Sequence, residues 1–119
     1  MKKTLVVGAS ENPSRYSYLA IRRLLAAGHE VEAIGKIPGN VAGVSIQLPF
    51  PRLKDIDTVT LYINPQHQQD YVEYLLNLTP RRVIFNPGTE NEDFYQLLQS
   101  RGIEVKEACT LVMLSTGQF

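Results

Sequence analysis

Short apolar runs rich in β-branched residues recur along this chain, and they restrict its fold more than any other feature. The runs are Thr4–Val7, Val31–Ile34, Thr58–Ile63, Arg82–Phe85 and Ile103–Lys106. Continuous apolar runs of this length are typical of strands that a parallel sheet buries on both faces. Between them, Gly35–Gly43 is expected to be a loop, and Val44–Ile46 is either a short extra strand or simply extended chain.

Segments with apolar residues at helical spacing separate most of these strands. The predicted helices are Tyr16–Ala27, Gln66–Leu78, and a third that is capped by Asn91 or Thr89 and runs to Arg101. Strands that alternate with helices of this size form parallel sheets through right-handed β-α-β units. The sequence therefore predicts an α/β fold of the Rossmann-like, three-layer type, with a five-stranded parallel sheet in the order 3-2-1-4-5.

The size and charge of the chain restrict the classes of function. Its 119 residues suit a single domain, 1–119, and a formal net charge of zero gives no general attraction to nucleic acid or to a membrane. The first apolar run stops at Gly8, too early for a secretion signal or a membrane span. Cys109 is the only cysteine, which excludes an intramolecular disulfide and fits a cytoplasmic location.

Four polar, turn-rich segments follow the predicted strands. They are Gly8–Ser17, Gly35–Gly39, Asn64–His67 and Asn86–Thr89. Open parallel sheets bind ligands at the carboxyl ends of their strands, where these segments should meet. The sequence therefore predicts a ligand site at that edge of the sheet.

The first of these segments differs from a dinucleotide-binding turn. The fingerprint G-x-G-x-x-G has three glycines, whereas this chain has Gly8, Ser10 and Pro13 at those positions, which weakens an NAD interpretation. In their place are hydroxyl groups, and Arg15 can hold a phosphate with two parallel hydrogen bonds. Hydroxyls and main-chain N–H groups at a helix start suit a phosphate group. The alternative is that these polar residues only cap the helix.

The residues at the end of the second predicted strand indicate which type of nucleotide the chain binds. NAD-binding domains place an acidic residue there for the ribose hydroxyls. This chain has Ile34-Gly35-Lys36 instead, and a lysine favours a ligand with an additional ribose phosphate, such as coenzyme A or NADP. The alternative is an ordinary solvated lysine.

The run from Val6 to Tyr18, V-V-G-A-S-E-N-P-S-R-Y-S-Y, resembles the opening of small stand-alone CoA-binding proteins, which are similar to the CoA-binding domain of the succinyl-CoA synthetase α chain. The resemblance implies that this segment contacts the CoA phosphates, that Gly35-Lys36 meets the adenosine end, and that Tyr62–Pro65 lines the adenine and pyrophosphate region. Phe85–Thr89 and the tail after Cys109 depart from the family pattern. The predicted cofactor-binding residues are Gly8, Ala9, Ser10, Asn12, Pro13, Arg15, Ser17, Gly35, Lys36, Ile63, Asn64 and Pro65.

Few residues suit catalysis. His67 falls on the ligand edge but has no carboxylate or nucleophile near it in sequence, and the chain shows neither metal-ligand spacing nor a G-x-x-x-x-G-K-[ST] phosphate loop. We therefore predict a protein that binds CoA or acyl-CoA and has no strong catalytic apparatus. One alternative is an NADP-binding, oxidoreductase-like module that needs a partner for its substrate. Another is a regulatory or structural module that senses a nucleotide or binds none.

The apolar tail Leu111–Leu114 admits two interpretations. It packs back on the sheet edge as a terminal strand, or it forms a homodimer contact. We expect the first.

Overall fold

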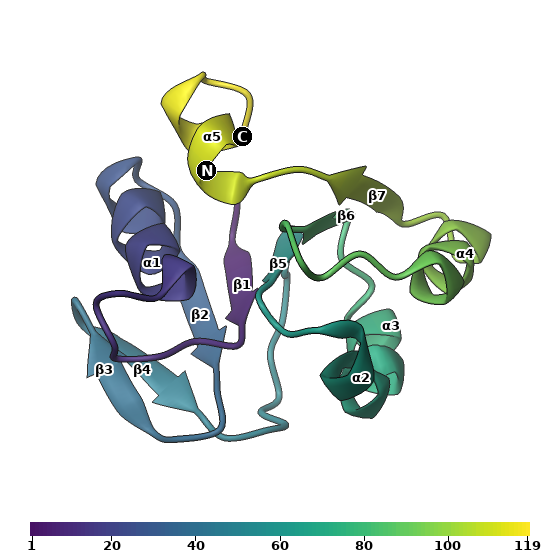
Figure 1. Ribbon diagram of the computed structural model, residues 1–119, viewed down its shortest axis with the longest axis horizontal. Helices are drawn as coiled ribbons and strands as arrows, with labels where there is room; N and C mark the ends of the chain where they lie inside the picture. The colour runs from purple at the N-terminus through teal and green to yellow at the C-terminus, as the bar shows by residue number, and fades with distance from the viewer.

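The first predicted strand, β1 (Thr4–Val7), lies in the middle of the sheet. In the computed structural model, which describes residues 1–119, β1 pairs in parallel with β2 (Val31–Ile34) and with β5 (Thr58–Leu61). β6 (Arg82–Phe85) and β7 (Glu104–Glu107) extend the sheet beyond β5, also in parallel (Figure 1). Every residue of β1, β5 and β6 is buried, which explains why their sequences are continuous rather than alternating.

The prediction of a five-stranded parallel sheet in the order 3-2-1-4-5 is wrong in the number of strands, in their order and in the direction of one strand. With β3 (Gly39–Val41) and β4 (Val44–Gln47) the sheet has seven strands, in the order β3-β4-β2-β1-β5-β6-β7. Thr58–Leu61 therefore lies beside β1 and not outside β2, because β4 already occupies the free side of β2 in parallel. The sheet is also mixed: β3, within the expected loop, runs antiparallel to β4.

A two-residue turn joins β3 to β4. Val41 pairs with Val44, and the two residues between them, Ala42 and Gly43, both have positive φ, 51° and 92°. Two consecutive positive φ values are the conformation that matches the twist of a tight hairpin. An alanine at the first of these positions is an unusual signal for such a turn, so the sequence did not reveal the hairpin.

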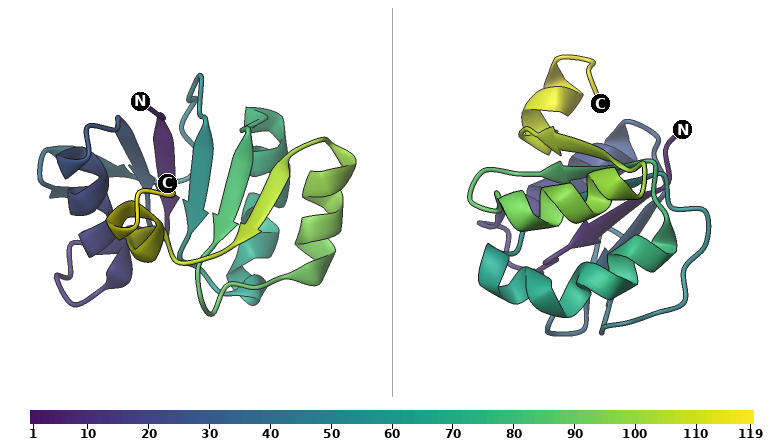
Figure 2. Two further views of the ribbon diagram at one scale, coloured as in Figure 1. Left: turned by 90° about the horizontal axis from the view of Figure 1, so that it is seen from above. Right: turned by 90° about the vertical axis from the view of Figure 1, so that its right-hand side faces the viewer.

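Helices cover both faces of the sheet, as the α/β interpretation predicts (Figure 2). α1 (Tyr16–Ala26) and α5 (Thr110–Ser115) are in contact on one side. The other side carries α2 (Pro65–Gln68), the 3-10 turn η1 (Gln69–Tyr71), α3 (Val72–Leu78) and α4 (Glu92–Ser100). The helix expected over Gln66–Leu78 is thus divided into three short segments. Asn91 caps α4 by accepting a hydrogen bond from the main-chain nitrogen of Phe94.

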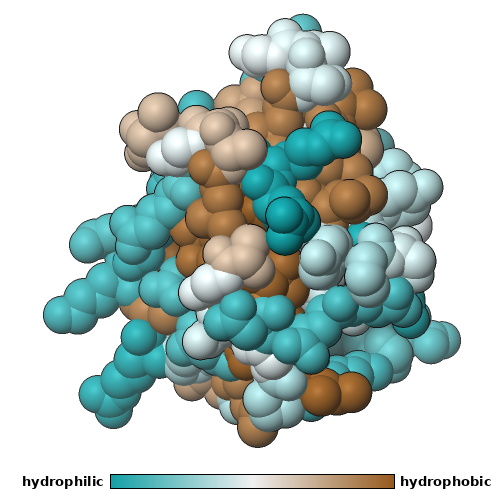
Figure 3. Space-filling view, turned by 90° about the vertical axis from the view of Figure 1, so that its left-hand side faces the viewer, coloured by the Kyte–Doolittle hydropathy of each residue, from teal (hydrophilic) through white to brown (hydrophobic).

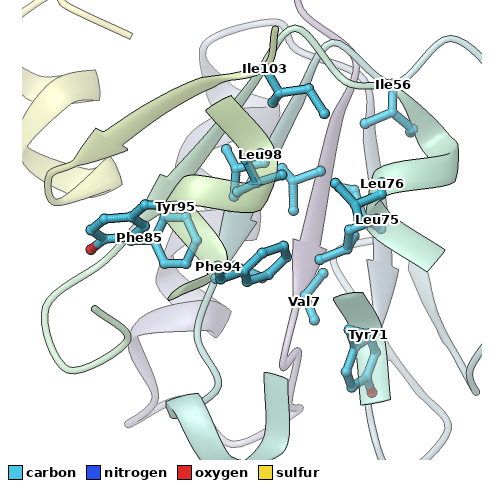
Figure 4. Close-up of a cluster of buried hydrophobic side chains, with 14 of the residues drawn as sticks. Val7, Ile56, Tyr71, Leu75, Leu76, Phe85, Phe94, Tyr95, Leu98 and Ile103 are labelled. Carbon is cyan, nitrogen blue, oxygen red and sulfur yellow. The ribbon is translucent and has the colours of Figure 1, made fainter. Parts of the chain in front are cut away.

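The core is divided by the sheet because successive strand residues point to opposite faces. Leu5 and Val7 join the larger cluster with side chains of α3 and α4, shown in Figure 4, whereas Val6 joins a smaller cluster with side chains of α1. None of the helices is long and apolar enough to cross a membrane. On the side of the molecule that carries α1 and the β3–β4 hairpin, hydrophilic side chains project beside hydrophobic areas of the surface (Figure 3).

The tail folds back over the sheet, but as the helix α5 and not as the terminal strand that we expected. Thr110 Oγ1 lies 2.8 Å from Thr60 Oγ1, and the main-chain nitrogen of Thr110 donates to Asn86 Oδ1 at 2.9 Å. Asn86 also donates through Nδ2 to Thr60 Oγ1 and to the main-chain oxygen of Leu61. This buried network attaches the start of α5 to β5 and β6.

Candidate functional site

A cleft of about 710 Å³ opens at the carboxyl ends of the central strands, the edge where ligands of open parallel sheets bind. It is lined by nearly all the predicted site residues: Gly8, Ala9, Ser10, Asn12, Arg15, Ser17, Gly35, Lys36, Ile63 and Asn64. Pro13 and Pro65 do not line the cleft. The structure therefore brings together side chains from loops that are far apart in the sequence.

The loop Gly8–Arg15, named the phosphate loop after its predicted role, turns sharply where β1 ends. Gly8 has a φ of 91°, and a Cβ atom there would lie 2.9 Å from Cγ2 of Ile63. The N–H groups of Gly8 and Ala9 both donate to the main-chain oxygen of Ile34, so they tie the loop to β2 and are not available to a ligand. Glycine is required at this position because the backbone is left-handed and crowded.

The polar side chains of the loop bond to one another and not to α1. Ser10 Oγ accepts a hydrogen bond from the nitrogen of Asn12, and Asn12 Oδ1 accepts hydrogen bonds from the nitrogen and the hydroxyl of Ser14. Arg15, at the N-cap position, makes no side-chain capping bond. The interpretation of these residues as helix caps is therefore wrong.

The amino end of α1 is left with free donors. The main-chain N–H groups of Tyr16 and Ser17 have no acceptor in the protein, and the Ser17 side chain is buried beside them. Arg15 and Lys36 are exposed and form no ion pair. All four residues line the cleft. Free N–H groups at a helix start, beside unpaired cations, favour an anionic ligand.

The β2 side of the cleft depends on a close approach of two loops. A Cβ atom at Gly35 would lie 2.5 Å from the main-chain oxygen of Ala9. Beyond it, Ile37 is 74 % exposed although it is apolar, and Tyr16 across the phosphate loop is 71 % exposed. Both side chains line the cleft; they belong to segments expected at the ligand edge but were not among the predicted cofactor-binding residues. Their exposure at a cleft suits the flat face of a base.

The phosphate loop also contacts the β3–β4 hairpin. Glu11 Oε2 accepts a hydrogen bond from the main-chain nitrogen of Asn40 at 2.7 Å. Glu11 is the only acidic side chain among the residues that line the cleft. Its role was missed because the hairpin itself was expected to be a loop.

The opposite wall is built from the loops after β5 and β6. Asn64 caps α2 by accepting through Oδ1 from the nitrogen of His67 at 3.1 Å. Gln68 is fully buried and bonds to Ile63, Thr89 and Asn91, which joins the two loops. This wall also carries Tyr62, which the resemblance implied, and Tyr71, which was not predicted. Four further lining residues come from the two turn-rich segments expected at the ligand edge: His67, Pro87, Gly88 and Thr89. None of these six was among the predicted cofactor-binding residues.

Tyr62 lies between the cleft and the smaller core cluster. Burial raises the pKa of its phenol to about 12, and the hydroxyl has no hydrogen-bond partner. Cys109, nearby in the fold, is a free, half-buried thiol. No group of three or more histidine, cysteine, aspartate or glutamate side chains converges as metal ligands. The chemistry of this site is that of hydrogen-bond donors and cations.

Comparison with known proteins gives one match to a family model, described as a CoA binding domain, over residues 2–115. The crystal structure of an uncharacterized protein is 52 % identical, covers 100 % of this chain and 98 % of its own, and superposes with a TM-score of 0.97. No curated protein matches the chain.

More distant structures share the fold. A hypothetical protein from Pyrococcus horikoshii OT3 is 24 % identical, with 97 % of this chain and 82 % of that chain covered and a TM-score of 0.87. The dinucleotide-forming acetyl-coenzyme A synthetase 1 of Ca. Korarchaeum cryptofilum, in complex with phosphate and ADP, is 18 % identical, with 90 % of this chain and 25 % of that chain covered and a TM-score of 0.73.

Proposed function

This chain belongs to the CoA binding domain family, and from that membership we propose that it binds coenzyme A, or an acyl ester of coenzyme A, in the cleft beside α1. One observation carries the assignment of the cleft. The N–H groups of Tyr16 and Ser17 have no protein acceptor, and the unpaired guanidinium of Arg15 stands next to them. A pyrophosphate supplies the acceptor oxygens and the negative charge that these groups lack.

The remaining lining residues divide between the two ends of such a ligand. Ser10, Asn12, Arg15 and Ser17 hold the phosphates in this proposal, while Gly8 and Ala9 shape the loop. Lys36 meets the ribose phosphate, with Gly35 keeping the loops close. Ile63 and Asn64 border the adenine. Pro13 and Pro65 set the backbone of their loops and do not touch the ligand, since neither lines the cleft.

Binding, and not catalysis, is the activity that we propose. His67 lines the cleft, but its side chain forms no hydrogen bond or ion pair with a carboxylate that would hold it as a general base. The proposal includes acyl-CoA, in which an acyl group is attached to the thiol of CoA. The cleft of about 710 Å³ is within the usual size range of small-molecule sites.

Calorimetric titration of the purified protein with CoA, NADPH, NADH and ATP tests the assignment. We expect saturable binding of CoA and markedly weaker binding of the other three. Tight binding of NADPH with no response to CoA would overturn the proposal in favour of an NADP-binding module. Native mass spectrometry of the freshly purified protein identifies any retained CoA or acyl-CoA by its added mass.

A further inference from the structure

One acidic side chain in the cleft is unfavourable for anion binding. Glu11 places a carboxylate on the phosphate loop, where its charge opposes a phosphate ligand. The same carboxylate accepts the N–H of Asn40 at 2.7 Å, across 29 residues of sequence. Because its charge disfavours a phosphate, the hydrogen bond to Asn40 is the property of Glu11 that can support ligand binding.

The hairpin is shaped to receive this carboxylate. A Cβ atom at Gly39 would lie 2.5 Å from Cδ of Glu11 and 2.7 Å from Oε2, so only glycine leaves room for the side chain. Asn40 belongs to β3, which has β4 on one side and no strand on the other. The carboxylate supplies its N–H with an acceptor, and hydrogen bonds to a charged oxygen are stronger than neutral ones.

The contact holds one end of the segment that carries Lys36. This segment, 36–38, connects β2 to β3. Its first end is held by Gly35, whose nitrogen donates to the main-chain oxygen of Gln47 at 3.0 Å. Its second end is held through Asn40 by Glu11. The Lys36 side chain has no hydrogen bond or ion pair of its own, so the path of the main chain alone decides where its ammonium group can reach.

We propose that Glu11 is a positioning residue for Lys36, and that the Glu11–Asn40 contact makes the cleft selective for a nucleotide with a phosphate on its ribose. This inference rests on the proposed function. Glu11 binds no ligand in this arrangement. It joins the loop that holds the pyrophosphate to the segment that holds the ribose phosphate, and so helps to fix the distance between the protein groups that bind these two anionic parts of the ligand.

The test compares CoA with dephospho-CoA, which lacks only the ribose phosphate. Calorimetry is run on the wild-type chain, Glu11→Gln, Glu11→Ala, Gly39→Ala and, as a control, Glu73→Ala, an exposed acid of α3 outside the cleft. We expect the wild type to prefer CoA roughly 10- to 100-fold, the contribution of one charged hydrogen bond. Glu11→Ala and Gly39→Ala lose most of this preference. Glu11→Gln keeps it, because the amide oxygen accepts the same hydrogen bond, and Glu73→Ala is unchanged.

The outcomes separate this inference from the function on which it rests. An unchanged preference for CoA in both Glu11→Ala and Gly39→Ala would overturn the inference and leave CoA binding intact. A parallel loss of CoA and dephospho-CoA affinity would also overturn it, because that is the result of a merely structural role. A wild-type chain that binds neither ligand overturns the proposed function itself. Gly39→Ala breaks the contact from the hairpin side, so a Glu11→Ala protein that fails to fold does not end the test.

Discussion

The side-chain nitrogen of Gln68 donates a hydrogen bond to the main-chain oxygen of Thr89 at 2.7 Å, and this bond joins the loops that follow β5 and β6. The same nitrogen donates to the main-chain oxygen of Ile63, and Oε1 accepts from Nδ2 of Asn91. Gln68 thus joins these loops through its side chain, as main-chain hydrogen bonds join neighbouring strands elsewhere in the sheet. It holds the wall of the cleft opposite the phosphate loop.

Replacing this side chain should destabilise the fold. We expect Gln68→Leu to lower the free energy of unfolding by about 1–3 kcal/mol, because it leaves buried polar groups without partners. Chemical denaturation measures the change. The neighbouring Gln69→Leu serves as the control, since Gln69 is exposed, and should lie within about 0.5 kcal/mol of the wild type. Equal losses in the two variants would contradict the role given to Gln68.

Removal of the phosphate-loop cation should weaken ligand binding without affecting the fold. Arg15 is exposed and its side chain makes no hydrogen bond or ion pair in the protein, so Arg15→Ala should leave the melting temperature unchanged. We expect its affinity for CoA to fall roughly 10- to 100-fold, as for the loss of a charged hydrogen bond. Calorimetry against Arg23→Ala, an exposed arginine in the last turn of α1, checks this. Unchanged affinity in Arg15→Ala would favour a module that does not bind phosphate there.

The close approach of Gly35 to Ala9 should not tolerate a side chain. Gly35→Ala would place its Cβ 2.5 Å from the main-chain oxygen of Ala9 and 2.9 Å from Cγ2 of Ile46. We expect a loss of about 1–3 kcal/mol, as for other overpacked interiors, together with weaker CoA binding. Gly43→Ala, in open space at a φ of 92°, carries only backbone strain and should leave CoA affinity unchanged. A stable Gly35→Ala protein with normal affinity would show that the two loops can separate.

Tyr62 should make the protein sensitive to alkaline pH. Burial raises the pKa of Tyr62 from its ordinary value of 10.0 to about 12, because the phenolate is poorly solvated there. A group with a raised pKa in the folded state contributes its full stability below the unfolded pKa, and loses it as pH rises through the folded value. Wild-type stability should therefore fall between pH 10 and about 12 more steeply than that of Tyr62→Phe. Denaturation midpoints across this range test the difference, and coincident curves would contradict it.

Local patterns were enough to predict that the loop after β1 lies at the cleft. Gly8, the serines and Arg15 are close in sequence, and a turn between a buried strand and a helix places them at the ligand edge wherever the other strands lie. The Asn91 cap and the buried strands β1, β5 and β6 follow from equally local signals. For this reason most of the predicted site residues line the cleft although the predicted strand order is wrong.

The errors concern features that depend on distant parts of the chain. Thr58–Leu61 lies beside β1 and not outside β2, because β4 pairs with the free side of β2. A glutamine in a helix is usually exposed, and only the tertiary structure shows that Gln68 is buried. The Glu11–Asn40 contact requires a hairpin whose turn, Ala42-Gly43, lacks the usual asparagine or aspartate signal.

The Glu11–Asn40 bond also bears on the solubility of the protein. Strands at the borders of a sheet offer free backbone groups to neighbouring molecules and so promote aggregation. Here the N–H of Asn40 on one border is already occupied by Glu11, while β7 on the other border exposes Glu104, Lys106 and Glu107. Both borders therefore resist the addition of another strand, and a mutation of Glu11 should increase aggregation during refolding as well as alter the cleft.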